Sequence, residues 1–315
     1  MPTGLGYLAK AGVVEQSAYG TPLAVTELLP IKPGFDGDSL FRLLADEVLE
    51  GKASQRVADQ GVRETKGRLP VQLRYQSAYL LLKHFFGTFA ANKFSLDNSI
   101  EGKFLTLAAE KQVSVWEFVG VKIPRLSIES SHEAVMLTAD LVAKTLNETG
   151  TVNTSATLAA LSNTSPNLLH SHLNFRIGDT VDALAAGDEV KISSFALELD
   201  RGMDEVHVNE DRTPIEGVEP QRRNVTLRFQ LERYTTNQFR TWLAARTILQ
   251  ARLFFDDPAS TKSFEILLPE LLLETAPVPV ADAGPMKSQI TARCYRRVNN
   301  TIMTVADEAE INLTT

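Results

Sequence analysis

The residues best suited to chemistry in this chain are two of its five histidines. His170 and His172 are separated by one serine. On a β-strand, residues i and i+2 point to the same face, so both imidazoles could contact one metal ion. The sequence supplies no third ligand at a motif spacing. We therefore interpret the pair as a linker histidine beside a strand histidine, and we predict no metal site.

Charged residues gather at several places without forming a known site. An acidic group comprises Asp36, Asp38, Asp46 and Glu47. Carboxylates bind Ca²⁺ well, but the EF-hand spacing is absent, so we interpret this group as a solvated loop. Short basic clusters comprise Arg222 with Arg223, and Arg293 with Arg296 and Arg297. We predict that they pair with acidic loops of a neighbouring copy rather than with nucleic acid.

Sequence motifs of common enzymes are missing. The chain has no P-loop, no GxGxxG after a strand, no HExxH and no GxSxG. Its single cysteine, Cys294, alternates with Ile290 and Ala292, which predicts a small core residue. One cysteine allows neither a disulfide within the chain nor a cysteine metal cluster. We predict no catalytic, cofactor-binding or metal-binding residues, and a protein that is not an enzyme.

Composition narrows the possible partners and location. The chain has 315 residues, a net charge of −7 and a pI of about 5.4. This balance argues against a nucleic-acid grip based on phosphate neutralisation, although DNA could pass such a surface without sticking. The first residues lack a basic region followed by an apolar run, and no apolar stretch reaches the ~18 residues of a membrane-spanning helix. We expect a protein made in a cytoplasm that has no membrane partner.

One strand-like sequence occurs twice. Val-Gln-Leu-Arg-Tyr-Gln begins at Val71, and Val-Thr-Leu-Arg-Phe-Gln begins at Val225, 154 residues later. The alignment continues without a gap through a helix-like segment, with Phe85 opposite Phe239. A second match, at a spacing of 145, aligns 124–129 with 269–274. We predict a duplicated strand–helix–strands unit, with one domain at 1–150 and the other at 151–315.

Residue periodicity predicts the elements of each half. Apolar residues in alternation predict strands at 5–15, 25–35, 69–76, 103–109, 113–121, 122–129, 134–146, 172–178, 190–201, 224–232, 252–255, 263–274 and 286–298. Helical spacing predicts helices at 77–91, with Ser77 as the N-cap, and at 235–249. Pro30 and Pro33 indicate an edge strand or a bend rather than a central strand. Charged segments at 36–66, which could include a short helix at 40–49, and at 202–223 predict two long loops. The segment 147–166 predicts a linker.

Several stretches resemble the tail tube (major tail) proteins of long-tailed phages. They are Gly12-Val-Val-Glu-Gln16 leading to Tyr19-Gly-Thr-Pro22, Gly67-Arg-Leu-Pro-Val-Gln-Leu73 leading into an apolar helix near Gly87, Pro166-Asn-Leu-Leu169, and Val190-Lys-Ile-Ser-Ser-Phe-Ala-Leu-Glu-Leu199. Together they extend over most of the chain. The second half lacks the Tyr-Gly-Thr-Pro opening, and its charged loop is shorter.

The resemblance implies a mainly β (α+β) protein with two similar β-sandwich or barrel domains, each with one packed helix. It implies a structural virion protein, made in the host bacterial cytoplasm and located in the phage tail. Copies would form rings that stack into a tube, and DNA would cross the lumen without sequence-specific binding. The tape measure and terminator proteins would be further partners. If each half fills one of six positions, three chains close a ring with pseudo-six-fold symmetry.

Alternatives remain at this point. Six chains could form the ring, with one half of each chain on the outside. The protein could instead form a single ring, as a tail terminator, baseplate or secretion-tube component on the same fold. A non-viral β-rich binding module, with a pocket where the halves meet, is a third reading. In the tube reading, the two long charged loops are expected to contact stacked rings.

Overall fold

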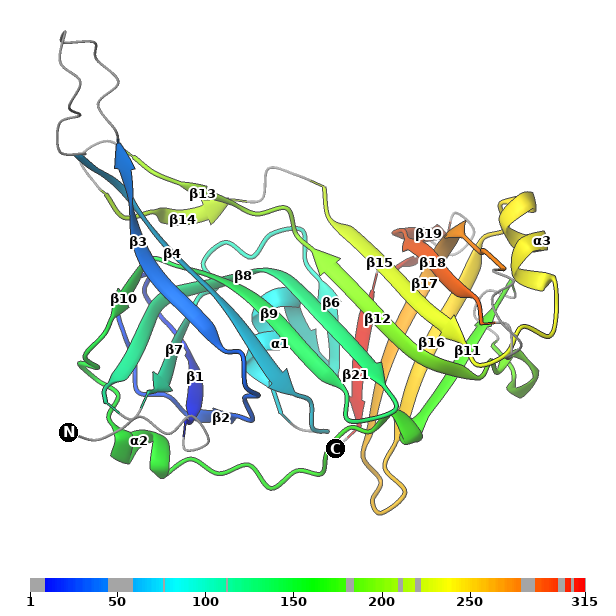
Figure 1. The fold of residues 1–315 in the computed structure, drawn as a ribbon, viewed down its shortest axis with the longest axis horizontal. Coiled ribbons are helices and arrows are strands. Elements are labelled where there is room, and N and C mark those ends of the chain that lie inside the picture. The colour runs from blue at the N-terminus through cyan, green and yellow to red at the C-terminus, as the bar shows by residue number, and fades with distance from the viewer. Residues whose placement is uncertain are drawn as a thin grey trace, which may run out of the picture.

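The computed structural model describes residues 9–44, 59–75, 77–111, 113–179, 184–208, 212–218, 222–278, 287–299, 304–306 and 309–314. In this part the chain forms two β-rich lobes that lie side by side and share a sheet (Figure 1). None of the helices described is both long and apolar enough to cross a membrane. The predicted mainly β fold class is confirmed.

The first half is built around one long strand. Its strands are β1 (Ala11–Glu15), β2 (Glu27–Leu29), β3 (Asp36–Leu44), β4 (Asp59–Gln72), β5 (Gly87–Ala90), β6 (Lys93–Leu96), β7 (Leu105–Glu110), β8 (Val115–Ser131), β9 (Met136–Ala143) and β10 (Thr145–Asn147). The first part of β8 pairs with β7 and β10, and β1 pairs with β7. The later part of β8 pairs with β9, which pairs with β4, which pairs with β3. Thus β8 takes part in two sheets, whereas the sequence predicted two separate strands there.

The second half has the same pairing order. Its strands are β11 (Leu173–Gly178), β12 (Ile192–Asp200), β13 (Asp204–Val206), β14 (Ile215–Val218), β15 (Asn224–Leu231), β16 (Leu249–Asp256), β17 (Ser263–Thr275), β18 (Gln289–Cys294), β19 (Arg297–Asn299), β20 (Thr304–Ala306) and β21 (Glu310–Thr314). The order β1-β7-β8-β10 recurs as β11-β16-β17-β21. The order β3-β4-β9-β8 recurs as β12-β15-β18-β17. In this half β17 takes part in both sheets.

Two strand pairings join the halves. β8 and β12 are antiparallel, and their register runs from Arg125 opposite Asp200 to Ser131 opposite Ser194. The order β3-β4-β9-β8-β12-β15-β18-β17 is therefore continuous, and we call it the shared sheet. Outside the shared sheet, β21 pairs with β17 of its own half and with β6 of the first half.

The alternating pattern of the repeated strands explains their burial. Val71, Leu73 and Tyr75 are buried. Their counterparts in the second half are buried too, namely Val225, Leu227 and Phe229. Successive side chains of a strand point to opposite faces, so these residues line the core while their neighbours face outward. Burial of each such side chain stabilises the fold by about 1.5–3 kcal/mol. The core is continuous from one half into the other.

Helix α1 (Tyr79–Phe86) is shorter than the predicted 77–91. It ends because Gly87 takes a φ of 92°, a left-handed conformation that stops a helix, and β5 begins at once. Ser77 is not the N-cap; its Oγ accepts a hydrogen bond from the Arg74 amide at 2.9 Å. The carboxylate of Glu27, distant in sequence, accepts the first two helical amides at 3.0 and 3.1 Å instead.

Helix α3 (Gln238–Ala245) occupies the matching place in the second half. It begins 159 residues after α1, whereas the strands match at a spacing of 154. The ungapped alignment through the helix was therefore wrong, because β15 continues to Leu231, five residues beyond the counterpart of the last residue of β4. A further helix, α2 (Ser155–Ala159), and two 3-10 turns, η2 (His170–His172) and η3 (Ala186–Asp188), complete the helical elements of the described residues.

His84 is a buried polar residue on α1. Neither of its ring nitrogens has a hydrogen-bond partner among the described residues. Burial lowers the pKa of His84 to about 4, although the Glu15 carboxylate, 3.6 Å from Nε2, raises it in part. His84 is therefore neutral near pH 7 and packs as a core ring.

The two predicted long loops are largely hairpins. Within 36–66, strands β3 and β4 pair from Asp36 opposite Arg68 to Leu44 opposite Asp59. Residues 40–44 are extended, so no helix forms there; 45–58 lie outside the described residues. Within 202–223, β13 pairs with β14. In both cases cross-strand pairing satisfies backbone groups that a charged loop would leave to water.

The β13–β14 hairpin lies against the first half, beside β3 and β4 (Figure 1). The Arg63 amide donates to the Arg212 carbonyl at 2.7 Å, and the Tyr19 hydroxyl donates to the Ile215 carbonyl at 3.2 Å. Lys122, a buried cation of β8, forms an ion pair with Glu216. These contacts fasten a hairpin of the second half to the first half.

The predicted linker at 147–166 is also fastened. The buried Glu117 carboxylate accepts the amides of Thr151, Val152 and Asn153 at 2.9, 2.8 and 2.5 Å. Burial raises the pKa of Glu117, but these hydrogen bonds outweigh it and hold the pKa below its usual range. The connection between the halves is thus pinned to β8.

Two arginines of the second half hold the end of α1 and the turn after β6. Arg201 is fully buried, and it donates to the carbonyls of Phe85 and Asp97 at 2.7 Å each. Arg223 donates to the carbonyls of Leu96 and Asp97 at 3.0 and 2.9 Å. A cation at a helix C-terminus also interacts favourably with the helix dipole.

Replacing the buried arginine should loosen the junction between the halves. We expect Arg201→Met to lower the free energy of unfolding by about 3 kcal/mol, because the Phe85 carbonyl loses its buried donor and the Asp97 carbonyl keeps only Arg223. Thermal and urea unfolding of the purified chain would measure it. The matched Arg240→Met, on the exposed side of α3, should change stability by no more than about 0.5 kcal/mol. Equal effects of the two substitutions would contradict this role for Arg201.

Candidate functional site

The outward face of the shared sheet is the most extensive ordered polar surface that we find in the described residues. One row of directly opposed residues crosses six strands: Asp36, Arg68, Asp140, Arg125, Asp200 and Asn224. Acid and base alternate from strand to strand along this row. Opposite charges facing each other across strands stabilise a sheet, whereas like charges destabilise it.

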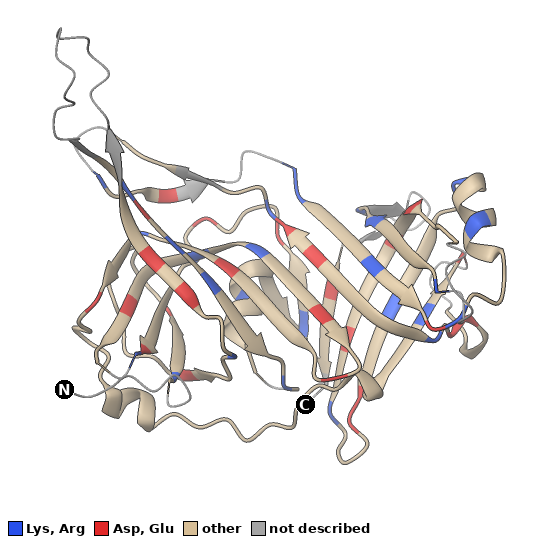
Figure 2. Ribbon diagram, viewed as in Figure 1, with Lys and Arg blue, Asp and Glu red and all other residues tan. Residues whose placement is uncertain are grey.

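The next two rows keep the charge nearly balanced. They read Pro70, Thr138, Ser127, Glu198, Thr226 and Arg293, then Gln72, Met136, Glu129, Ala196, Arg228 and Thr291. Across the three rows, acidic residues outnumber arginines by one. Ion pairs at 2.8 Å join Arg125 to Asp200 and Arg228 to Glu198. Figure 2 shows acidic and basic positions interspersed over this sheet.

This face is hollowed at two places. One cavity, of about 400 Å³, lies across β8, β9, β12 and β15, with Glu129 and Arg228 among its lining residues. A second, of about 490 Å³, lies over β3, β4 and β9, with Asp140 and Arg68 in its lining. Both are open and mixed in charge, so the face offers a shallow polar surface rather than a closed pocket.

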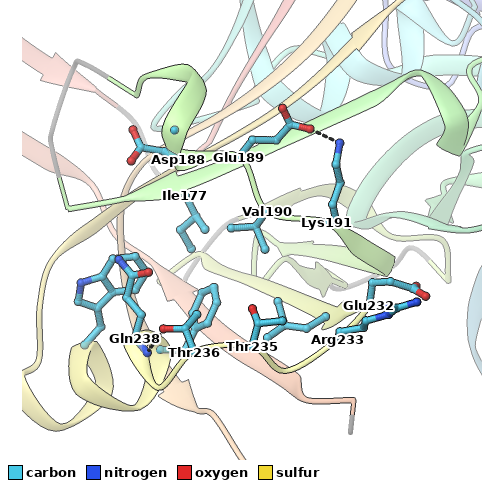
Figure 3. A pocket seen from close by; sticks show the side chains of 14 residues that line it. Ile177, Asp188, Glu189, Val190, Lys191, Glu232, Arg233, Thr235, Thr236 and Gln238 are labelled. Carbon is cyan, nitrogen blue, oxygen red and sulfur yellow. Dashed lines mark hydrogen bonds and ion pairs between the residues drawn. The ribbon is translucent and has the colours of Figure 1, made fainter. Parts of the chain in front are cut away.

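A larger cavity of about 560 Å³ lies beside α3 in the second half (Figure 3). Ile177, Val190 and Phe239 contribute apolar lining, and charged side chains form its rim. On the rim, Lys191 forms an ion pair with Glu189. The Asp188 carboxylate accepts the Ala185 amide at 2.7 Å, as part of the η3 turn. Asp188, Glu189 and Lys191 thus have local structural partners.

The two candidate histidines do not act together. His172 Nδ1 is hydrogen-bonded to the Tyr75 hydroxyl at 2.9 Å, while His170 Nε2 lies 3.2 Å from the Ile192 carbonyl. The His170 ring also packs against Phe195. Among the residues described, no group of three or more His, Cys, Asp or Glu is placed to hold a metal ion. Both histidines lie in the 3-10 turn η2, so the prediction that His172 belongs to a strand was wrong.

The charged clusters noted in the sequence separate into different roles. Asp36 joins the charged row, Asp38 lies nearby on β3, and Asp46 and Glu47 fall outside the described residues. Arg223 bonds carbonyls of its own chain, and Arg293 donates to the Asn224 side chain at 3.0 Å. Cys294 is buried, as predicted.

A comparison with protein families identifies the class of protein that carries this polar face. The family model of phage tail tube proteins matches residues 6–294. The chain belongs to the phage tail tube protein family. No curated protein matches the sequence. The matched span covers both halves and every strand of the shared sheet.

Membership of this family defines what kind of protein this chain is and where it is located. A phage tail tube protein is a structural component of the virion tail and not an enzyme. It assembles with copies of itself and associates with other tail proteins. For such a protein, the relevant site is a surface and an edge rather than a catalytic centre.

The charged rows were not visible in the sequence. Gln72, Thr226 and Arg228 lie on the outward face, whereas Arg74 donates to the Asn163 carbonyl at 2.7 Å. Rows depend on the register between strands far apart in the chain, such as β8 and β12. The alternation within each strand was the only signal available in the sequence. It predicts which face of the sheet a side chain occupies, but not which residue of the adjacent strand lies opposite.

The Arg125–Asp200 pair should contribute little stability, because both side chains are solvent-accessible. A double-mutant cycle with Arg125→Gln and Asp200→Asn should give a coupling of about 0.5 kcal/mol that shrinks as salt is raised. Urea unfolding at low and high salt would measure it. A coupling above about 2 kcal/mol would mean that this pair, rather than the backbone pairing, holds the halves together.

Proposed function

We propose that this tail tube protein is a duplicated tube subunit, with domains 1–150 and 151–315, and that three copies close a ring with pseudo-six-fold symmetry. Rings stack into a tube whose lumen is the conduit for DNA ejection. The chain is made in the host bacterial cytoplasm and meets the tape measure and terminator proteins during tail assembly. The proposal rests chiefly on one observation, the continuous sheet across both halves.

The recurrence of strand order supports the duplication. Each half has one long strand shared by two sheets, and the neighbours of β8 recur around β17 in the same order. The β8–β12 pairing then joins one unit to the next within the chain. A contact that joins two similar units side by side can be repeated between chains, and it closes a ring when the rotation is right.

The same observation favours three chains over six. In a ring of six chains, one half of each chain would lie outside the ring. Here both halves place strands in a single sheet, and both contribute charged residues to the same polar face. The single-ring alternative, a terminator or baseplate component, differs only in whether rings stack.

The polar face suits a lumen through which DNA moves. Its arginines stand next to carboxylates, so the surface is close to neutral and lacks the unpaired basic stripe that phosphate binding requires. DNA would pass without sequence-specific contacts. The opposite face of the sheet is buried in the core.

Counting copies in assembled particles tests the ring directly. Native mass spectrometry or image averaging of isolated rings should give three copies of the 34.7 kDa chain. The averaged density should show six similar lobes that alternate in two forms, because the halves differ in sequence. Six copies per ring would contradict the trimer.

The β3–β4 hairpin is suited to contacts between stacked rings. It projects beyond the shared sheet (Figure 1), and it carries apolar side chains in solvent. Leu40 is 64% exposed and Phe41 is 38% exposed. An apolar residue on an exposed strand edge usually marks a contact with another molecule.

A polar substitution on this hairpin should separate ring formation from stacking. We expect Leu40→Asp to leave folded chains that form rings but few or no tubes, because burying a carboxylate at the contact is costly. Leu40→Met keeps an apolar side chain and should form tubes normally. Electron microscopy distinguishes tubes from single rings. Normal tubes from Leu40→Asp would exclude this residue from the stacking contact.

A further inference from the structure

The β13–β14 hairpin occupies the place in the second half that the outer part of the β3–β4 hairpin occupies in the first. It lies between β12 and β15, which are the counterparts of β3 and β4. The two hairpins nevertheless differ in position. β3–β4 projects beyond the shared sheet, whereas β13–β14 lies against the first half (Figure 1), where the Arg63 amide of β4 donates to the Arg212 carbonyl at 2.7 Å.

We propose that the first half carries a docking surface for a hairpin, formed by Tyr19, Gly102 and Lys122, and that β13–β14 of the same chain occupies it. The second half has no equivalent surface. In the proposed ring, three of the six hairpins are therefore held within their own chains, and only the three β3–β4 hairpins are free to reach the next ring. This count rests on the proposed function, whereas the docking itself does not require a ring.

Glu216 of β14 makes the central contact with the docking surface. Its carboxylate pairs with Lys122, whose side chain is only 4% exposed, and accepts the Gly102 amide at 2.6 Å. Lys122 also donates to the Ile100 carbonyl at 3.0 Å. An isolated buried charge is costly, so a cation buried to this extent needs a partner of opposite charge. The first half thus presents a buried lysine whose ion-pair partner comes from the second half.

Tyr19, from the Tyr-Gly-Thr-Pro segment, makes the second contact. Its hydroxyl donates to the Ile215 carbonyl at 3.2 Å. Its ring packs edge-on against Phe104, with centroids 5.3 Å apart. The ring also lies beside Gly120, where a Cβ atom would come within 2.8 Å of it. Glycine at this position therefore leaves room for the tyrosine that holds the hairpin.

The sequence of the second half supplies no counterpart of these three groups. The segment after β11 corresponds to the segment that places Tyr19 after β1, and residues 178–189 include no aromatic residue. β17, the counterpart of β8 and of its Lys122, contains neither lysine nor arginine. Residues 246–248 alone join α3 to β16, so the turn between β6 and β7 that contains Gly102 has no equivalent. A β3–β4 hairpin of a neighbouring copy would therefore find no such surface on the second half.

Removing the charge of Glu216 tests the docking within single chains. At concentrations too low for rings, we expect Glu216→Gln to speed amide hydrogen exchange at residues 213–216 and at Gly102 by about tenfold or more, because Lys122 loses its ion-pair partner. Hydrogen-exchange mass spectrometry would measure this. The matched Glu64→Gln, on β4, removes a carboxylate that pairs with the exposed Lys66, and it should change exchange by less than about twofold.

A second variant keeps the test decisive if the first does not fold. Tyr19→Phe removes one hydroxyl and keeps the ring, so it should speed exchange at residues 213–216 by a smaller factor, of about threefold. Thermal unfolding would identify the folded variants. Unchanged exchange at residues 213–216 in folded variants would show that the hairpin does not dock through these groups.

Comparing rings with tubes tests which hairpins remain free. We expect residues 36–41 and 61–66 of the β3–β4 hairpin to gain protection from exchange when rings stack. Residues 213–216 should be equally protected in single chains, rings and tubes. Ile215 on β14 is 39% exposed, so stacking through β13–β14 is the competing outcome. Protection of residues 213–216 that is gained only in tubes would overturn the inference.

The outcomes separate the inference from the proposed function. If the wild type forms neither rings nor tubes, the proposed function fails, and exchange in single chains still decides whether the hairpin docks. If Glu216→Gln releases the hairpin and tubes form normally, both stand. If the released hairpin abolishes tubes while rings remain intact, β13–β14 is itself a stacking element and the inference is wrong.

Discussion

The backbone pairing of β8 with β12 is the constraint on which the rest of this structure depends. In a strand pair, a shift of one residue turns every side chain to the opposite face. The register from Arg125 to Ser131 therefore decides at once which residues of both halves enter the core and which reach the polar face. The alternating charges of that face are a consequence of this register. Exposed ion pairs contribute little energy, so they cannot replace it.

Contacts outside the shared sheet make the junction inside the chain stronger than any copy of it between chains. Arg201 and Arg223 bond carbonyls of the first half, and β21 bridges β17 and β6. The β5–β6 hairpin that receives β21 follows α1. After α3 only residues 246–248 precede β16, so the second half offers no similar hairpin. The junction inside the chain is therefore held by contacts outside the shared sheet as well as within it. A contact between chains that repeated this junction would rely on the shared sheet alone.

The sequence predicted the periodic features and missed those set by distant partners. Alternation identified the buried faces of β4 and β15, because a strand's own residues determine which side is apolar. It failed at α1, where Gly87 and the distant Glu27 set the helix ends. The charged residues at 36–66 were interpreted as a loop, because composition alone does not show that β3 pairs with β4. The charged row could not be inferred, since it depends on strands far apart in the chain. Pro30 and Pro33 did indicate a sheet edge, but not which strand lies beside it.

The two end strands of the shared sheet can pair with strands of another molecule, but prolines limit that pairing. An open edge invites pairing with any strand, and prolines on an edge limit such pairing. Pro30 and Pro33 flank Lys32, so the segment of this edge that precedes β3 offers few amides for pairing. A contact this short is weak when formed singly. In the proposed ring, closure would stabilise such contacts, because the last contact forms without bringing in another chain. In the proposed three-chain ring, the β8–β12 junction inside each chain would supply three of the six joints, and only the other three would have to form between chains.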